Sequence, residues 1–392
     1  MQILITNNTL AGRAGTELYV RDLALGLLER GHQPFAFSTR LGDVASELTA
    51  AGVTVTDDLD SLTVRPDIIH GHHHLDTMTA LLHFPGTPAI YVCHGSTPWE
   101  EAAPRFPRIL GYVAVDHACL DRLVLEDGIP EDRIRVLLNF VDLQKFKQRP
   151  ALPERPQRAL IFSNNANDNT HTEAIRSACD RVNISVDVVG KAVGNASREP
   201  EAMLGNYDLV FAKGRAALEA LAVGTAVILC DAAGAGPMVT SENLPELRPL
   251  NFGLRALREE LSSEVISREI ARYDPRDAEH VSQVIRADAG REAVLDELIT
   301  LYRDVIQEYE ASSHDPIAEQ QAASRYLRGL SPRLKSVEDA VGKETAARIN
   351  EMEKELKLIK NSRGWRLISR YSAIKHKLLL PTYGRARGVF RR

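Results

Sequence analysis

Several kinds of site are missing from this 392-residue chain, and each absence narrows what the protein can be. Its four cysteines are scattered and form no Cys-x-x-Cys pair, so neither a zinc knuckle nor a redox motif is expected. No apolar run is long enough to predict a transmembrane helix. Gly-x-Ser-x-Gly, Walker A and His-Glu-x-x-His patterns are also absent, which disfavours hydrolases, P-loop NTPases and metalloproteases.

The ends of the chain differ in charge and character. The start, from Met1 to Thr6, is an apolar strand without the basic segment of a secretory signal, so a cytoplasmic protein is expected. Arg363 to Arg392 holds nine Lys or Arg and no Asp or Glu, whereas the rest of the chain has 39 basic and 53 acidic residues and a net charge of −14. This basic end predicts an anionic partner, and a membrane surface is favoured over a nucleic acid.

An imperfect apolar face accompanies that basic charge. Trp365, Leu367, Ile368, Tyr371 and Ile374 lie among arginines and lysines, as in a helix at an anionic lipid interface. The protein would then be peripheral on the inner face of the cytoplasmic membrane. The alternative is that the tail helix is solvated or makes an oligomer.

Strands alternate with helices along most of the chain, which predicts parallel α/β sheets. The interpretation is a first Rossmann-like domain at residues 1–150, a second at 151–310 with closing helices, and a helical, basic C-terminal tail at 311–392. A proline-rich stretch at 147–156 separates the first two domains. Because ligands gather at the carboxyl ends of parallel strands, the loops after the strands are the places to look for a site.

The most informative of these loops lies between Asp208 and Asp231. It reads as a buried strand, a basic turn at Lys213-Gly214-Arg215, a helix closed by Gly224, and another strand. The helix N-terminus and the two basic side chains should attract a diphosphate, and Glu219, one turn further on, can accept from sugar hydroxyls. The alternative is an ordinary crossover whose basic residues are solvated.

Two glycine-containing or polar loops of the first half are further candidates. Gly12 and Gly15 precede Thr16-Glu17 at a helix start and permit close approach of a ligand, but they do not form the dinucleotide-binding pattern, so NAD is disfavoured. The second candidate follows Asp67-Ile68-Ile69, where His70, His72 and His74 share one face if the strand stays extended. A polar cleft wall is preferred there over a metal site.

His94 follows the predicted strand at residues 89–92, where it can hydrogen-bond a sugar hydroxyl or serve as a structural histidine. In the second half, the loop Ser163-Asn164-Asn165 offers neutral donors for a diphosphate. The loop 231–240 contains Gly234 and Gly236, which bring backbone N–H groups to a ligand or simply make a flexible turn.

Together these segments resemble GT-B fold glycosyltransferases, in particular retaining family 4, over residues 1–310. The resemblance rests on the order and spacing of Ala14 to Ala24, Glu29 to His32, Asp67 to His72, His94-Gly95, and Asn139 to Phe146, which is similar to the family's hinge. It implies two Rossmann-like domains facing a cleft, a nucleotide-diphosphate sugar held by the second, and a saccharide or lipid-linked acceptor held by the first. It implies no required metal or other cofactor, and cell-surface polysaccharide synthesis as the setting.

Residue by residue, the resemblance implies that Glu219 holds the donor ribose, Gly15 lies near the donor phosphates and His94 contacts the transferred sugar. Gly12, Glu17, His70 and His72 are expected on the acceptor side. The chain departs from the family pattern where Phe211 occupies the first glutamate position of E-x7-E. The basic residues usual after the first strand of the second domain are also missing, and Lys213 and Arg215 are our candidates to replace them.

The expected mechanism is a same-face displacement in which cations and helix N–H groups stabilise the departing diphosphate. Lys213, Arg215 and His94 are the catalytic candidates. The alternatives are a nucleotide-sugar epimerase or hydrolase of the same fold, and a catalytically inactive scaffold.

Overall fold

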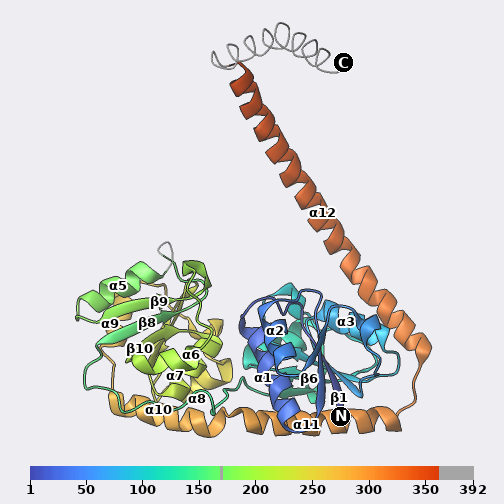
Figure 1. The fold of residues 1–392 in the computed structure, drawn as a ribbon, viewed down its shortest axis with the longest axis horizontal. Helices are drawn as coiled ribbons and strands as arrows, with labels where there is room; N and C mark the ends of the chain where they lie inside the picture. Colours follow the sequence, from blue (N-terminus) through green and yellow to red (C-terminus); the bar gives the residue numbers. More distant parts are fainter. Residues whose placement is uncertain (168–170, 362–392) are drawn as a thin grey trace, which may run out of the picture. The chain divides into compact units, whose positions relative to one another are not determined.

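The computed structural model describes residues 1–167 and 171–361, and these fall into two compact units. The first unit is Met1–Glu319, and the second begins at Gln320. Figure 1 shows the strands and shorter helices of the first unit and the long helix α12, most of which belongs to the second. The basic segment from Arg363 onward, including Trp365, lies outside the described residues.

The first sheet has seven parallel strands in the order β3-β2-β1-β4-β5-β6-β7. They are β1 (Gln2–Thr6), β2 (Gln33–Phe37), β3 (Thr54–Thr56), β4 (Ile68–His72), β5 (Ala89–Cys93), β6 (Ile109–Ala114) and β7 (Ile134–Val136). Their connections include α1 (Gly15–Glu29), α2 (Asp43–Ala50), α3 (His74–His83) and α4 (His117–Asp121). The strand order reverses between β1 and β4, so the crevice for a ligand opens beyond Thr6 and His72.

The second sheet has five strands in the order β12-β11-β10-β8-β9. They are β8 (Arg158–Phe162), β9 (Ser185–Val189), β10 (Leu209–Ala212), β11 (Ala226–Asp231) and β12 (Gly234–Met238), which runs antiparallel to β11. The helices of this region are α5 (Thr172–Asp180), α6 (Pro200–Met203), α7 (Gly214–Val223), α8 (Leu244–Leu247), α9 (Ser263–Ile270) and α10 (Pro275–Asp288). Here the order reverses between β8 and β10, which places the expected crevice beyond Phe162 and Ala212.

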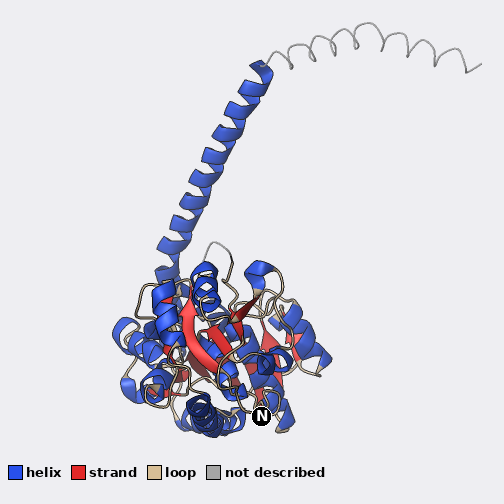
Figure 2. Ribbon diagram, turned by 90° about the vertical axis from the view of Figure 1, so that its left-hand side faces the viewer, coloured by secondary structure: helices blue, strands red, loops and turns tan. Residues whose placement is uncertain are grey.

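Helices lie on both sides of the strands, as Figure 2 shows. In the second sheet, β10 has four consecutive buried apolar residues, as a strand covered on both faces requires. One face packs with Leu218 and Leu221 of α7, and the other with Ile175 of α5. Gly224 ends α7 in the left-handed conformation, with φ 97°, as the sequence predicts.

Helix α11 (Arg291–Ala311) follows the second sheet in sequence but packs against the first. It contacts α1, β5 and β6, and Figure 1 shows it running along this part of the molecule. A Cβ on Gly26 of α1 would lie 2.4 Å from Leu295, so the glycine permits the close crossing of the two helices. The sequence interpretation assigned residues up to 310 to the second domain, whereas α11 completes the core of the first sheet.

Helix α12 (Pro316–Asn361) is 46 residues long and lies within the predicted helical tail at 311–392. No described helix combines the length and the apolar character that crossing a membrane would require. The two predicted Rossmann-like halves and the helical C-terminal part are thus the architecture that the described residues have.

Candidate ligand-binding cleft

A cleft of about 590 Å³ lies at the carboxyl ends of both sheets. Its walls come from the loop before α1, the loop after β5, the loop after β8 and the start of α7. Eight of the predicted site residues line it together: Gly15, His94, Ser163, Asn164, Asn165, Lys213, Arg215 and Glu219. Residues from four separate loops of the sequence therefore share one cavity.

Lys213 is the residue immediately before α7, and its charge is paired. Its Nζ lies 3.0 Å from Oδ2 of Asp231, the last residue of β11, and burial lowers the pKa of Lys213. Asp231 also accepts hydrogen bonds from the Ser163 hydroxyl (3.4 Å) and the Ala232 N–H (2.7 Å). This carboxylate thus ties together the ends of β8, β10 and β11. Lys213 retains an exposed side-chain fraction of 32%, so it can reach a ligand in the cleft.

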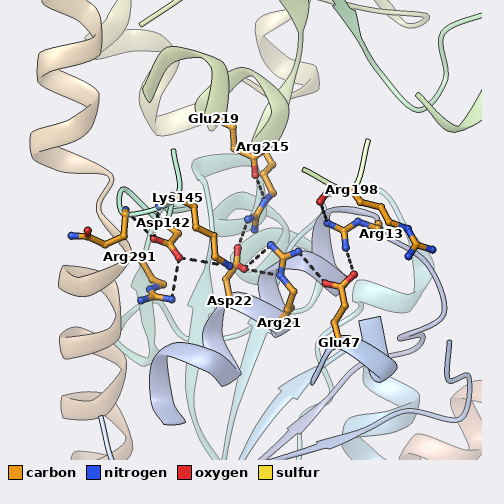
Figure 3. A network of polar contacts seen from close by, with 11 residues as sticks. Arg13, Arg21, Asp22, Glu47, Asp142, Lys145, Arg198, Arg215, Glu219 and Arg291 are labelled. Atoms are coloured by element: carbon orange, nitrogen blue, oxygen red, sulfur yellow. Dashed lines mark hydrogen bonds and ion pairs between the residues drawn. The ribbon is translucent and has the colours of Figure 1, made fainter. Parts of the chain in front are cut away.

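Arg215 lies between two carboxylates, from helices that pack on different sheets. Its Nη2 donates to Asp22 of α1, and its Nε donates to Oε1 of Glu219 at 2.7 Å (Figure 3). Burial, the largest influence, disfavours the charged guanidinium, but Asp22 and Glu219 outweigh it and raise the pKa of Arg215. The cation is therefore permanently charged and already neutralised within the protein.

The two carboxylates around Arg215 differ in their titration. Burial acts to raise the pKa of Asp22, but Arg215 and Arg21 outweigh burial and lower it. For Glu219, burial prevails over Arg215, and its pKa is raised. Asp22 is therefore the stable anion of the cluster, and Glu219 is the group that more readily exchanges a proton or a hydrogen bond with a ligand.

The neutral loop after β8 is fixed by its neighbours. The Ser163 hydroxyl accepts from the Asn165 N–H at 3.2 Å, and Asn164 Oδ1 accepts from the Lys191 N–H at 3.2 Å. Gly190, after β9, touches the loop so closely that a Cβ there would lie 1.9 Å from the Ser163 carbonyl oxygen. The loop is thus held at the cleft by packing against a glycine.

His94 faces the cleft from the loop after β5 and is held from behind by His72. The His94 Nε2 lies 2.8 Å from His72 Nδ1, and the His94 ring packs edge-on against Tyr19 at 4.6 Å between centroids. The His94 N–H donates to Glu101 at 2.9 Å. Burial lowers the pKa of His94 well below its usual value, so the imidazole is neutral and can accept or donate a single hydrogen bond at Nδ1.

The histidines after β4 do not share one face as predicted. His70 and His72 do, with ring centroids 4.6 Å apart, but β4 ends at His72, and His73 adopts φ 58°. His74 therefore begins α3 and packs against Trp99. Within residues 1–167 and 171–361, no three His, Cys, Asp or Glu side chains are grouped so that they could hold a metal ion.

His70 and His72 lie behind the cleft wall instead of in it. His70 Nδ1 is 2.5 Å from the hydroxyl of Tyr302 in α11, and burial lowers the pKa of His70 to about 3. Both rings are fully buried, so neither histidine can touch an acceptor directly in this arrangement. Their expected acceptor-side role is replaced by support of His94 from within the core.

Four other predicted site residues lie outside the cleft walls. Glu17 is buried in the first turn of α1, and a Cβ on Gly12 would meet its carboxylate at 3.5 Å. The predicted loop 231–240 is mostly the strand β12, so Gly234 and Gly236 pack against the segment 256–259. A Cβ on Gly236 would lie 2.4 Å from the Ala256 carbonyl oxygen. These two glycines serve close backbone packing, not a ligand.

Three carboxylates at the site were not predicted from the sequence. Asp22 lies in the middle of α1, Asp231 ends a strand, and Glu101 ends the short 3-10 helix Trp99–Glu101, where burial raises its pKa to about 7. Asp22 and Asp231 belong to segments whose sequence was recognised, but their partners come from elsewhere in the chain. Glu101 carries no sequence signal, because an acidic residue after Trp99-Glu100 resembles any solvated turn.

Comparison with known proteins places this geometry in a fold. Residues 13–145 match the model of Glycosyltransferase Family 4. A glycosyltransferase structure from Rickettsia africae ESF-5 has 13% identity and a TM-score of 0.57, covering 78% of this chain and 98% of that chain. HepE from Anabaena, in complex with UDP and glucose, has 13% identity and a TM-score of 0.55, covering 76% of this chain and 98% of that one.

A third similar structure is sucrose-phosphate synthase from Thermosynechococcus elongatus, with 15% identity, a TM-score of 0.53, and coverage of 79% of this chain and 100% of that one. No curated protein sequence matches this chain significantly. At these identities the likeness concerns the fold, and it confirms the predicted GT-B architecture of two α/β sheets.

Proposed function

We propose that this chain, which has the GT-B fold and matches glycosyltransferase family 4 over residues 13–145, is a glycosyltransferase that uses a nucleotide-diphosphate sugar. The observation that carries the proposal is the convergence of Gly15, His94, Lys213 and Glu219 on one cleft between the ends of the two sheets. A saccharide or lipid-linked acceptor would enter from the side of the first sheet. The similar HepE structure contains UDP and glucose, which supports a nucleotide donor.

The donor diphosphate is assigned to the start of α7 and the loop Ser163–Asn165. The first-turn N–H groups of a helix carry partial positive charge, and Lys213 adds a full charge that is one third exposed. In a transfer with retention, this charge stabilises the departing diphosphate without a metal ion. Arg215 acts by a different route than expected, since its guanidinium holds Glu219 in place and does not point a free charge at the ligand.

Glu219 is assigned to the ribose and His94 to the transferred sugar. Oε1 of Glu219 is occupied by Arg215, so its second oxygen is the acceptor for a ribose hydroxyl. The neutral His94 ring, oriented by His72, presents Nδ1 as a single hydrogen-bonding atom. Each assignment leaves the observed contacts of these side chains intact.

A catalytically inactive relative that binds a nucleotide is the second candidate. It is favoured by the pairing of both basic residues, Lys213 with Asp231 and Arg215 with Asp22, and by Phe211, which is buried in β10 where the family pattern has a glutamate. An epimerase or hydrolase of the same fold would differ from both candidates because it releases product without an acceptor.

Calorimetry with UDP, GDP, ADP, CDP and dTDP tests the proposal. We expect one diphosphate to bind wild type, Lys213→Ala to weaken that binding at least tenfold, and Lys147→Ala, which removes an exposed lysine outside the cleft, to leave it unchanged. Incubation of the corresponding nucleotide sugar with and without saccharide acceptors then separates transferase from hydrolase or epimerase. Absence of binding by all five diphosphates would overturn the donor site, and binding without turnover would favour the inactive candidate.

Association with an anionic membrane surface is part of the proposal for the acceptor. The nine basic residues from Arg363 to Arg392 support it through their charge alone, since they lie outside the described residues. Co-sedimentation with vesicles containing phosphatidylserine, compared with a chain that ends at Ser362, tests this part separately from donor binding.

A further inference from the structure

Helix α12 carries exposed apolar side chains along most of its length. Five of them have exposed fractions between 52% and 60%: Leu327, Leu334, Val337, Ile349 and Met352. A helix that keeps such side chains in water loses the hydrophobic stabilisation that a partner would supply. The spacing of these residues shows whether they form one continuous surface.

The apolar residues follow the spacing of a coiled-coil seam. The intervals between successive apolar residues alternate between three and four, except for one interval of eight that has Thr345 at its midpoint. The residues are Leu327, Leu330, Leu334, Val337, Val341, Ile349, Met352, Leu356 and Ile359. Alternating steps of three and four are the a and d positions of a heptad repeat. The interval of eight residues from Val341 to Ile349 is one residue longer than a heptad, and coiled coils absorb such an insertion by a local change in winding. The side chains of seven of these residues are described, all except Val341 and Ile359, and we define the seam as those seven.

Charged residues flank the seam in a pattern that fits a parallel pair of helices. In a parallel, in-register dimer, a g residue meets the e residue five positions further along the partner helix. Three such g–e pairs have a charged residue at both positions, and in each pair the two charges are opposite. The pairs are Arg333 with Glu338, Arg348 with Glu353, and Glu355 with Lys360. Two-fold symmetry doubles each pair.

Residues that would disturb packing lie away from the seam. Pro332 falls at an f position, on the outer side of the helix, and Gly329 falls at c. The 46 residues of α12 correspond to about 70 Å of helix, which is much longer than the usual helix of a globular domain. Two exposed apolar residues of α12, Ile317 and Leu358, do not belong to the seam, and Leu358 provides a control.

We propose that the seam of α12 is the docking surface for a second copy of this chain, which pairs with the first as a parallel two-stranded coiled coil. A lipid surface fits less well, because interfacial helices have a polar face rich in Lys and Arg. Here Glu338, Glu353 and Glu355 flank the apolar stripe directly. The proposal is independent of the proposed enzymatic function.

Parallel pairing has a consequence for the rest of the chain. Both copies of α12 end at the same end of the coiled coil, so two basic segments, each with nine Lys or Arg, continue from one place. Two weak electrostatic contacts that are linked in this way bind a surface more tightly than either alone.

Light scattering coupled to size-exclusion chromatography of the full chain tests the dimer. We expect a dimer for wild type and a monomer for the double variant Leu334→Asp, Met352→Asp. Leu358→Asp, which introduces the same charge at a side chain with an exposed fraction of 72%, should remain a dimer. A monomeric wild type at micromolar concentration, or a dimer that survives the double variant, would overturn the proposal.

Charge exchange and cross-linking test the parallel orientation. Glu353→Arg should weaken the dimer, and Arg348→Glu added to it should restore the dimer, because the two residues face each other between copies. Val337→Cys should form a disulfide-linked dimer under mild oxidation, whereas Leu358→Cys should not; the four natural cysteines are buried. Cross-linking of both variants alike, or failure of the charge exchange, would contradict a parallel seam.

The same double variant separates a second copy from a membrane. If wild type is monomeric but binds vesicles containing phosphatidylserine, and Leu334→Asp, Met352→Asp abolishes that binding, the seam is a lipid-binding surface and the dimer is wrong. If the double variant binds vesicles as wild type does while losing the dimer, the seam serves the second copy.

Discussion

Arg215 of α7 donates a hydrogen bond to Asp22 of α1, and this ion pair joins the helix at the basic turn of the second sheet to the first helix of the chain. Figure 3 shows the pair within a longer network that continues through Arg21 and Glu47 to Arg13. The side chain expected to attract a diphosphate is thus a structural link across the cleft. The predictions below separate such structural charges from those available to a ligand.

Arg215→Ala should lower the free energy of unfolding by about 3–5 kcal/mol, because it leaves Glu219 buried without its cation and Asp22 paired with Arg21 alone. Arg158→Ala, which breaks a surface pair with Asp187, should change it by less than about 1 kcal/mol. Urea unfolding monitored by circular dichroism measures both. Equal effects of the two substitutions would mean that the pair across the cleft contributes no more than a surface pair.

Lys213→Ala should retain most of the stability and lose ligand binding. After the substitution, Asp231 still accepts from Ser163 and from the Ala232 N–H, so its charge stays hydrogen-bonded. We expect the affinity for the preferred nucleoside diphosphate to fall at least tenfold, or about 1.4 kcal/mol, while the melting temperature changes little. Unchanged affinity would show that Lys213 serves Asp231 alone.

Glu219→Ala should remove the preference for an intact ribose. Arg215 still pairs with Asp22 in this variant, so the loss is confined to one acceptor. Calorimetry should show that wild type binds the ribonucleoside diphosphate more tightly than its 2′,3′-dideoxy analogue, by about 1–3 kcal/mol for the lost hydrogen bonds, and that the variant binds both alike. If wild type does not distinguish the two ligands, Glu219 does not hold the ribose.

Gly190→Ala should displace the loop after β8 and weaken donor binding. The new Cβ would lie 1.9 Å from the Ser163 carbonyl oxygen, so the backbone must move, at a cost of about 1–3 kcal/mol of stability. Gly205→Ala is the matched control, because its nearest neighbour would be Arg149 Cβ at 3.8 Å. Comparison of the two variants by calorimetry tests whether the position of Ser163 to Asn165 matters for the ligand.

His70→Phe should reduce the loss of unfolding free energy that the wild-type protein shows as the pH falls below 6.5. Burial lowers the pKa of His70 to about 3 from an ordinary value of 6.5, so the unfolded chain gains a proton first as pH falls. The contribution of His70 to the free energy of unfolding is complete above pH 6.5. It is smaller by about 2 kcal/mol at pH 5 and continues to fall toward pH 3.

Urea unfolding at pH 7.5 and pH 5 measures the difference between wild type and His70→Phe. Glu101 and Asp76 act in the opposite sense, since burial raises their pKa values to about 7, but they are present in both proteins and cancel. His280→Gln, at an exposed position on α10, should keep the wild-type slope. A slope unchanged by His70→Phe would place the acid sensitivity elsewhere.

The sequence sufficed for the strands and turn around Lys213, and so for the main wall of the site, because those features are local. The apolar run of β10, the turn at Lys213 and the closing Gly224 lie within a few residues of one another, and each adopts its predicted conformation. Parallel strands then bring the ends of β8 and β10 together through topology alone. Ser163 and Lys213 could therefore be placed at one site.

The partners of those residues depend on tertiary contacts that no local pattern contains. Asp22 meets Arg215 across 193 residues, and His70 meets Tyr302 across 232. His74 does not share the face of His70 because His73 takes a positive φ. A run of histidines in the sequence does not predict that backbone conformation. Gly234 resembles a loop glycine until β12 is seen to pair with β11.

The position of α11 bears on how the chain is made. Leu295, Leu298 and Tyr302 are buried in the core of the first sheet, and Tyr302 covers His70, yet they are translated after the whole second sheet. The strands β5 and β6 must therefore wait, with part of one face uncovered, for a helix that begins about 180 residues after β6 ends. During synthesis the lobe begun first is the one completed last, and its exposed face in that interval is where a chaperone would be needed.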